Sequence, residues 1–213
     1  MKIEPRRTLA LADRIGRPVV VFDIEHSGGA APRCGILEFG AIILRPDRRI
    51  ERFSTLLNPG DVDFNPFATR VHGITRRAIA KAPAYHGQCS EFIDHHDDSL
   101  WVGFNSNASD IPKLKGEHAR FGLPVPEFPH RLDVMRLARN VAGLRGGLLT
   151  MIEAAVPQAA RRAHRAMDDA EMTLVLLEYV LPLTTDEDLK QFGLPLRLDG
   201  LSRARKSPSQ SHT

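Results

Sequence analysis

The stretch Val19-Val20-Val21-Phe22-Asp23-Ile24-Glu25 decides the fold. Its apolar residues are mostly β-branched or aromatic, which is typical of a strand that is buried on both faces. Two carboxylates nevertheless stand at its end, and because alternate residues of a strand share a face, Asp23 and Glu25 should project side by side. Two like charges at the edge of a core are costly unless a positive charge joins them. The stretch therefore predicts a central strand that ends at a binding site for a divalent cation.

Length, composition and charge are those of an ordinary globular protein. The 213 residues can bury a full core, and 42% of them are hydrophobic and 26% charged. The net charge of +3 permits an anionic partner without requiring one. The two cysteines, Cys34 and Cys89, lack metal-ligand spacing and suit a reducing cytoplasm, where we expect the protein to act. We expect no membrane partner and no secretory signal peptide, because no apolar run is long enough and the N-terminus is charged.

Periodicity and turn residues predict an α/β chain that begins with three strands and continues with alternating helices and strands. Strands are expected at residues 19–25, 36–44, 52–57, 100–104 and 131–134, the first three as an antiparallel meander. Helices are expected at residues 8–15, 66–71, 75–80, 86–96, 109–121, 134–140, 148–155 and 166–181. This order predicts a mixed five-stranded sheet with helices on both faces.

A second acidic position follows the strand expected at residues 100–104. The strand ends in a polar turn that contains Asn105, and Asp110 opens the next helix. An aspartate at a helix start commonly serves as an N-terminal cap. The carboxyl end of a strand is, however, also where open α/β sheets bind their ligands.

A third acidic position lies at the start of the last long helix. Helical phase places Asp169 on the stripe that faces the core, and Asp168 on a more exposed stripe that ends at Glu178. We therefore interpret Asp168 as a solvated acid of the first turn. Asp169 is the residue whose charge, on the core-facing stripe, needs a positively charged partner. His164 precedes this helix; a lone histidine is more often structural, but its pKa near neutrality would let it accept a proton from water.

The acidic positions could converge on one site made of Asp23, Glu25, Asp110 and Asp169. Carboxylate oxygens select hard cations such as Mg²⁺ or Mn²⁺. Two such ions about 4 Å apart would stabilise both the attacking and the leaving oxygen of a phosphoryl transfer.

In these segments the chain resembles the DEDDh branch of the DnaQ-like 3′-5′ exonucleases, which belong to the ribonuclease H-like superfamily. That branch has a histidine five residues before its last aspartate, as His164 stands before Asp169. Val71-His72-Gly73-Ile74-Thr75 resembles the family's His-Gly-Ile-Thr segment, and Arg131-Leu132-Asp133-Val134 resembles its passage from a strand into a helix. The resemblance covers roughly residues 18–180.

The resemblance implies a three-layer ribonuclease H-like fold and a metal-dependent hydrolase that releases nucleoside 5′-monophosphates from 3′ ends of single-stranded DNA or RNA. It implies that two divalent cations, Mg²⁺ or Mn²⁺, bind to Asp23, Glu25, Asp110 and Asp169, and that His164 is the general base. A polymerase or another nucleic-acid-processing protein is a further candidate partner. We divide the chain into an N-terminal extension with a short helix (1–17), an exonuclease domain (18–200) and a basic tail (201–213) that we expect to be disordered.

The chain departs from the family beside two of its acidic motifs. The family usually has Thr-Thr-Gly after its first motif, where this chain has His26-Ser27-Gly28, and commonly a phenylalanine where this chain has Ser109. The arginines near the proposed base could bind phosphates or belong to an ordinary charged loop. We predict substrate contacts for His26, Ser27, Gly28, Asn105, Arg161, Arg162 and Arg165.

The role of two lysines and the choice between functions are left open. Lys113 and Lys115 could also meet a backbone phosphate, although a solvated helix face is their more ordinary location. A nuclease-like module without activity, which binds nucleic acid or a protein, is the main alternative function, although such a module needs no costly cluster of acids. A nuclease of the same fold that cuts internally is a third possibility, and it would release oligonucleotides.

Overall fold

One five-stranded sheet organises the computed structural model, which describes residues 4–29, 33–161 and 164–194. Its strands are β1 (Val19–His26), β2 (Ile36–Leu44), β3 (Ile50–Leu56), β4 (Leu100–Gly103) and β5 (Arg131–Asp133). Their order is β3-β2-β1-β4-β5, with antiparallel pairs on the β3 side of β1 and parallel pairs on the β5 side. The predicted mixed sheet with an antiparallel meander is confirmed.

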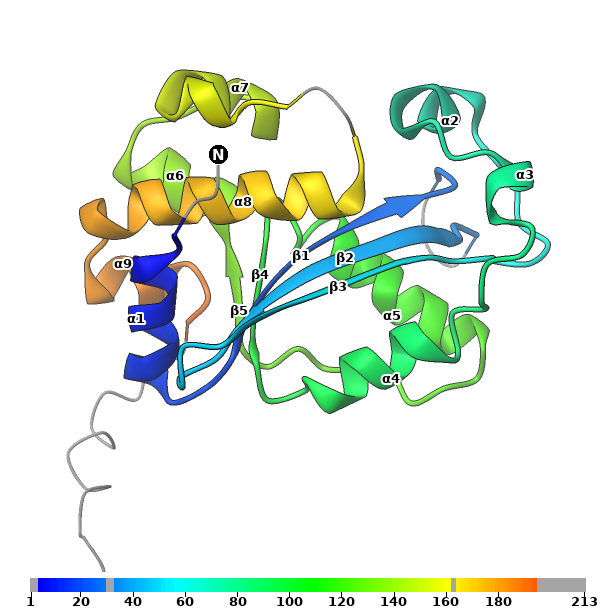
Figure 1. The fold of residues 1–213 in the computed structure, drawn as a ribbon, viewed down its shortest axis with the longest axis horizontal. Coiled ribbons are helices and arrows are strands. Elements are labelled where there is room, and N and C mark those ends of the chain that lie inside the picture. Colours follow the sequence, from blue (N-terminus) through cyan, green and yellow to red (C-terminus); the bar gives the residue numbers. More distant parts are fainter. Residues whose placement is uncertain (1–3, 30–32, 162–163, 195–213) are drawn as a thin grey trace, which may run out of the picture.

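Helices cover both faces of this sheet (Figure 1). The chain forms α1 (Arg6–Ile15), α2 (Pro66–His72), α3 (Arg76–Ile79), α4 (Gln88–His95), α5 (Asp110–Arg120), α6 (Val134–Val141), α7 (Leu148–Ala155), α8 (Ala166–Val180) and α9 (Asp186–Gln191). Two short 3-10 helices, Pro157–Ala159 and Leu181–Leu183, lie among them. Helices α4 and α5 pack on one face, and α8 packs on the other face together with α1, α6 and α7. These layers match the fold class that the sequence predicts.

The alternation of β1 separates two hydrophobic cores. Val19 and Val21 pack toward α8, whereas Val20, Phe22 and Ile24 pack toward α4 and α5. Because side chains alternate along a strand, the next residues on the α8 side are Asp23 and Glu25. The strand therefore presents both carboxylates to the helix that carries Asp169, as its sequence predicts.

Helix α8 is more deeply buried than its sequence predicts. Val175 and Glu178, on the stripe expected to be exposed, are each only 6% exposed. The Glu178 carboxylate accepts hydrogen bonds from the backbone N–H groups of Arg7 and Thr8 and from the Thr8 hydroxyl. The expectation of an exposed stripe was wrong because α1 covers this part of α8, a contact between segments that are distant in the sequence.

Other differences from the predicted elements are small. Strand β3 begins at Ile50, before the predicted start at residue 52, and α9 was not predicted. Helix α9 is short, and Thr185 and Asp188 form a capping box at its start. The predicted tail (201–213) lies outside the described residues, so the division of the chain into three parts stays a prediction.

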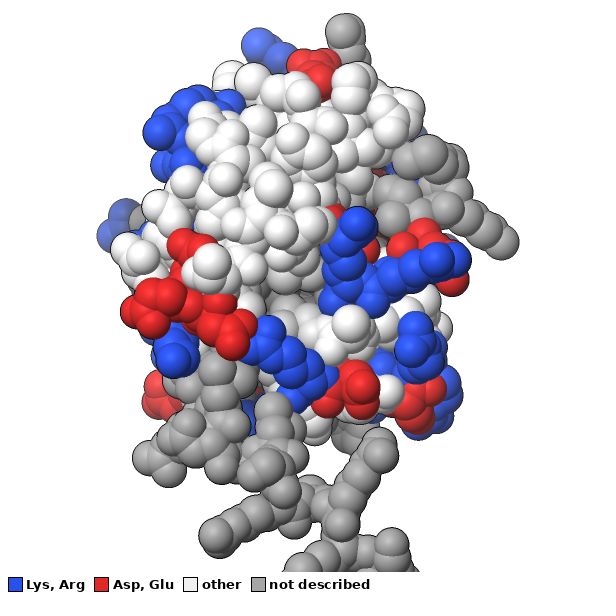
Figure 2. Space-filling view, turned by 90° about the vertical axis from the view of Figure 1, so that its left-hand side faces the viewer, with Lys and Arg blue, Asp and Glu red and all other residues white. Residues whose placement is uncertain are grey.

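The surface and the lengths of the helices add two observations. Figure 2 shows the end of the molecule near α1 and α9, where Lys and Arg are interspersed with Asp and Glu rather than forming one basic surface. Within the described residues, no helix has both the length and the apolar character needed to cross a membrane.

Candidate active site

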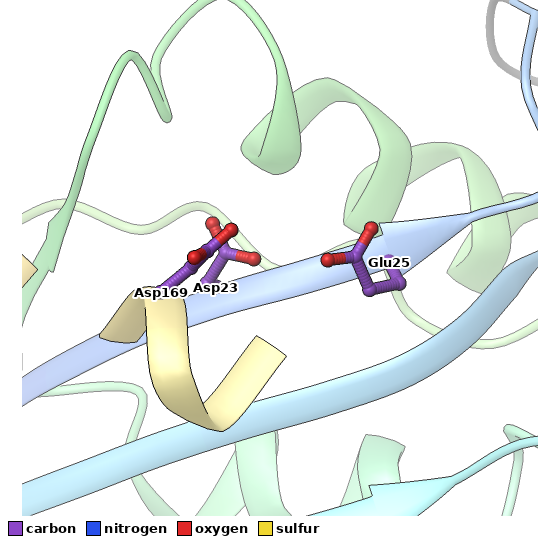
Figure 3. Close-up of side chains that lie close together, drawn as sticks. All are labelled: Asp23, Glu25 and Asp169. Carbon is purple, nitrogen blue, oxygen red and sulfur yellow. The ribbon is translucent and has the colours of Figure 1, made fainter. Parts of the chain in front are cut away.

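Three carboxylates from β1 and α8 meet on one face of the sheet (Figure 3). Asp23 and Glu25 project from β1, and Asp169 projects from the first turn of α8. One oxygen from each carboxylate can be chosen so that all three atoms lie within 4.8 Å of one another. Two predicted motifs that are far apart in the sequence are thus brought together.

Gly40 allows α8 to approach the sheet at this point. It lies opposite Asp23 in the register of β1 and β2. A Cβ atom at Gly40 would lie 2.5 Å from the backbone nitrogen of Met167 and 2.6 Å from the carbonyl carbon of Ala166. These are backbone atoms of the first turn of α8, so a side chain at position 40 would push the helix away from Asp23.

Glu38 fixes the start of α8 from the neighbouring strand. It lies opposite Glu25 in the register, and its side chain is only 4% exposed. Its carboxylate accepts hydrogen bonds from Arg165 (2.6 Å from Nη2 and 2.9 Å from Nε) and from the backbone N–H of Ala166 at 3.1 Å. Because His164 precedes Arg165 and Asp169 follows one turn later, this contact positions the segment that carries both residues.

Asp110 approaches the same site from the next strand. Strands β1 and β4 are parallel and pair Val21 with Val102, so their carboxyl ends lie together. Asp110 begins α5 just after β4, and its side chain is buried. Its negative charge is, after burial, the largest influence that raises the pKa of Asp23. The structure therefore places Asp110 near Asp23, although the group of three mutually close carboxylates is Asp23, Glu25 and Asp169.

Asp133 holds the turn that leads to Asp110. It caps α6, accepting hydrogen bonds from the backbone N–H groups of Met135 and Arg136, and it also accepts one from Asn105 at 3.1 Å. Asn105 has a φ of 56°, in the left-handed region that asparagine tolerates better than most residues. The predicted substrate residue Asn105 thus lies in a turn that β5 fixes through Asp133.

Burial and crowding make the four acids difficult to ionise together. Burial and the charge of Asp110 raise the pKa of Asp23 well above its usual value. Burial and the charge of Asp169 raise the pKa of Glu25 to about 8. Burial raises the pKa of Asp110 to about 7 and that of Asp169 to about 6, the latter against the opposing effect of His164. A cation is the natural partner for such a cluster, because it removes the repulsion between the carboxylates.

The residues fit a divalent cation. All donors of the three-carboxylate group are oxygens, which hard cations such as Mg²⁺ and Mn²⁺ prefer. The Oδ1 atom of Asp169 is buried and has no hydrogen-bond partner within the described part of the chain. Buried polar atoms normally have a partner, so an unpaired oxygen on one of three mutually close carboxylates indicates a ligand position.

His164 stands beside this group at the protein surface. Its Nδ1 lies 3.7 Å from Oδ2 of Asp169, and its side chain is 49% exposed. The five-residue spacing thus brings the two side chains together across the start of α8. The position leaves the imidazole accessible to water, although its role as general base stays a prediction.

The segment after β1 is fixed by contacts within the protein. The Ser27 hydroxyl accepts a hydrogen bond from the N–H of Gly35 (3.0 Å), and the Ser27 carbonyl accepts one from Asn65 (2.7 Å). The His26 Nδ1 accepts one from the N–H of Gly28 (3.0 Å). A Cβ atom at Gly28 would lie 2.4 Å from the Cβ of Asn65, so glycine is required there. The segment is ordered beside Glu25, and its contact with substrate stays a prediction.

The arginines near His164 contact carboxylates. Arg161 lies 2.8 Å from Asp168 and 2.5 Å from Glu171, and Arg165 forms the bidentate pair with Glu38. Arg162 lies outside the described residues. Substrate contact by these three arginines stays a prediction, and Arg165 has the additional structural contact just described.

Sequence reasoning missed Glu38 and Gly40, although one feature pointed to the first of them. Glu38 is the only charged residue in the otherwise apolar stretch Ile36–Leu44, so its burial required a partner. The close approach at Gly40 depends on where α8 lies, which no local pattern shows. Asp133 was noted only as part of a family-like segment, without a role.

Comparison with known proteins agrees with this geometry. The family model RNase T, described as exonuclease, matches residues 20–177. This range includes β1 from its second residue onward, all of α5 and the part of α8 that carries the site. The match therefore covers all three acidic segments and His164.

Relatives with a curated description include a plant protein and a bacterial DNA polymerase. Protein NEN3 of Arabidopsis thaliana is 32% identical over 68% of this chain and 29% of its own length. A PolC-type DNA polymerase III of Caldanaerobacter subterraneus is 26% identical over 82% of this chain and 12% of its own length. The chain thus spans about a third or less of the length of these two relatives.

Solved structures share the fold. The nuclease domain of 3′hExo, a DEDDh family member bound to rAMP, has a TM-score of 0.64 and 17% identity, and the match covers 78% of this chain and 92% of that domain. This likeness confirms the ribonuclease H-like arrangement of the sheet and helices. Together with the family match over residues 20–177, it shows that the chain belongs to the RNase T family of exonucleases.

Proposed function

We propose that this exonuclease hydrolyses single-stranded nucleic acid stepwise from the 3′ end and releases nucleoside 5′-monophosphates. The observation that carries the proposal is the convergence of Asp23 and Glu25 from β1 with Asp169 from α8, beside the accessible His164. A binding module without activity would have no use for carboxylates whose pKa values burial and mutual repulsion raise so far.

The cations proposed for this site are two Mg²⁺ or Mn²⁺ ions held by Asp23, Glu25, Asp110 and Asp169. When bound, they would activate the attacking water as Lewis acids and stabilise the charge that develops on the departing oxygen. The carboxylates would keep their orientation because Gly40, Glu38 and Asp133 fix the elements that carry them.

His164 is proposed to accept the proton of the attacking water. The water oxygen forms a bond to phosphorus, and the bond between phosphorus and the 3′ oxygen of the preceding nucleoside breaks. The products are a nucleoside 5′-monophosphate and a strand with a new 3′ hydroxyl, which takes up a proton from solvent. The exposed position of His164 suits this role, because the imidazole can return its proton to bulk water between turnovers.

Product analysis tests the proposal. Single-stranded DNA and RNA oligonucleotides of the same sequence, labelled at the 5′ end, are incubated with Mg²⁺ or Mn²⁺ and with wild type or Asp23→Ala. We expect wild type to shorten the labelled strand one nucleotide at a time and to release mononucleotides, and Asp23→Ala to release none.

Three outcomes would contradict the proposal. Immediate loss of the 5′ label as a mononucleotide would mean attack from the other end, and unlabelled oligonucleotides as products would mean internal cutting. Equal release by wild type and Asp23→Ala would exclude this site. The DNA and RNA arms also identify the preferred substrate, and the likeness to a segment of a PolC-type polymerase supports DNA and a polymerase partner as candidates.

A further inference from the structure

Lys113 lies one helical turn after Asp110, at the start of α5. Its Nζ donates hydrogen bonds to the carbonyl oxygen of Ser109 at 3.2 Å and to the Ser109 hydroxyl at 3.1 Å. The side chain is therefore folded back over the beginning of α5, toward the carboxyl ends of β1 and β4. An ordinary surface lysine would extend into solvent instead.

The contact with Ser109 places the Lys113 ammonium at the edge of the site. Because Ser109 directly precedes Asp110, the ammonium lies at the start of α5, next to the acid that approaches Asp23.

Lys113 has no carboxylate within ion-pair distance in the parts of the chain that the structure describes. Lys115, two residues later on the same helix, instead forms an ion pair with Glu127 at 3.2 Å. A lysine that is held in place by neutral oxygens keeps its charge available for an incoming anion. Ammonium groups of this kind bind phosphates as compact point charges.

Ser109 gives this arrangement an anchor. Its hydroxyl is one of the two oxygens that Lys113 contacts. Ser109 therefore orients the cation with its side chain as well as with its backbone carbonyl.

We propose that Lys113 binds a non-bridging oxygen of the backbone phosphate adjacent to the one that is cleaved, and that Ser109 holds the ammonium ready for it. The inference rests on the proposed function, since it requires a nucleic-acid strand in the site. We assign the adjacent phosphate because the ammonium is held at Ser109, at the start of α5, whereas the group of mutually close carboxylates is made by β1 and α8. Lys113 is thus a substrate-binding residue that positions the strand.

Steady-state cleavage at several salt concentrations tests this inference, with wild type, Lys113→Met, Lys113→Arg and Lys115→Met. We expect Lys113→Met to raise KM about tenfold, as loss of one charged hydrogen bond does, with little change in kcat. The slope of log(kcat/KM) against log salt should become shallower by about 0.7, the value for one contact with a single strand. Lys113→Arg should restore most of the loss, and Lys115→Met should behave as wild type.

A neutral methylphosphonate placed at successive linkages of the oligonucleotide locates the contact. At the linkage next to the scissile phosphate, the neutral group should raise the KM of wild type. It should cause little further increase in the KM of Lys113→Met. An unchanged KM and an unchanged salt slope in Lys113→Met would overturn the inference. This holds even if the variant unfolds at a lower temperature than wild type. Failure of wild type to release mononucleotides would instead contradict the proposed function, so the two results are distinguishable.

Discussion

Asp168 and Asp169 are chemically identical neighbours in the first turn of α8, yet their surroundings differ. The Asp168 side chain is 35% exposed and lies 2.8 Å from Arg161. The Asp169 side chain is 14% exposed and has a buried oxygen without a hydrogen-bond partner in the described structure. Helical phase alone predicted which of the two side chains is the more buried, because a step of one residue turns a side chain from solvent toward the core.

Removal of the His164 imidazole tests its role at the scale of one residue. We expect His164→Ala to lower kcat on the order of 10²-fold, since removal of a general base commonly has this effect. Folding should be unaffected because the side chain is half-exposed. His95→Ala, at the exposed end of α4, is the control and should cleave at the wild-type rate; unchanged turnover in His164→Ala would reject the assignment.

The elements of the fold were largely predictable from the sequence. The sheet and the face of Asp23 and Glu25 were predicted from the apolar runs of β1 and β2. The helical layers were predicted from the periodicity of α5 and α8. Contacts between distant elements were not predictable. Glu178 binds the start of α1, and Glu38 binds the start of α8, through partners about 170 and 130 residues away in the sequence.

Gly40→Ala tests how closely α8 must approach the sheet. The new Cβ would meet the backbone of Ala166 and Met167 at less than 3 Å, so we expect the first turn of α8 to shift. The substitution should lower the free energy of unfolding by about 1–3 kcal/mol, typical of overpacking, and reduce nuclease activity more strongly because Asp169 moves.

Gly147→Ala is the matched control for this prediction. Gly147 precedes α7, and a Cβ there would meet no atom within 4 Å. Activity should remain at the wild-type level. A fully active Gly40→Ala protein would contradict the argument that the position of α8 determines the site.

At the scale of the whole molecule, the carboxylate cluster opposes folding when no cation is bound. Burial and neighbouring charges raise the pKa of Glu25 from 4.5 to about 8, so the folded protein holds a proton that the unfolded chain has lost between these values. Stability rises with pH only where the unfolded chain binds more protons, and here it binds fewer. The metal-free protein should therefore lose stability as the pH rises from about 5 to about 8.

Glu25→Gln should weaken this dependence, because glutamine resembles the protonated acid and does not titrate, whereas Asp23, Asp110 and Asp169 still do. With a chelator present, we expect the variant to unfold at a higher temperature than wild type near pH 8. The difference should be about 2–4 °C for each kcal/mol by which the substitution raises the free energy of unfolding. The two proteins should unfold at nearly equal temperatures near pH 5, which thermal scans at both values would check. Parallel pH profiles for the two proteins would contradict this assignment.

The central claim is that carboxylates from β1 and α8 jointly hold divalent cations. Calorimetric titration of Mn²⁺ into wild type, Asp169→Asn and Asp168→Asn tests it most directly, since the two variants remove one charge at adjacent positions of one helix. We predict that wild type and Asp168→Asn bind about two Mn²⁺ ions per chain. Asp169→Asn should lose the tighter binding; equal Mn²⁺ uptake by both variants, or none by wild type, would contradict the claim.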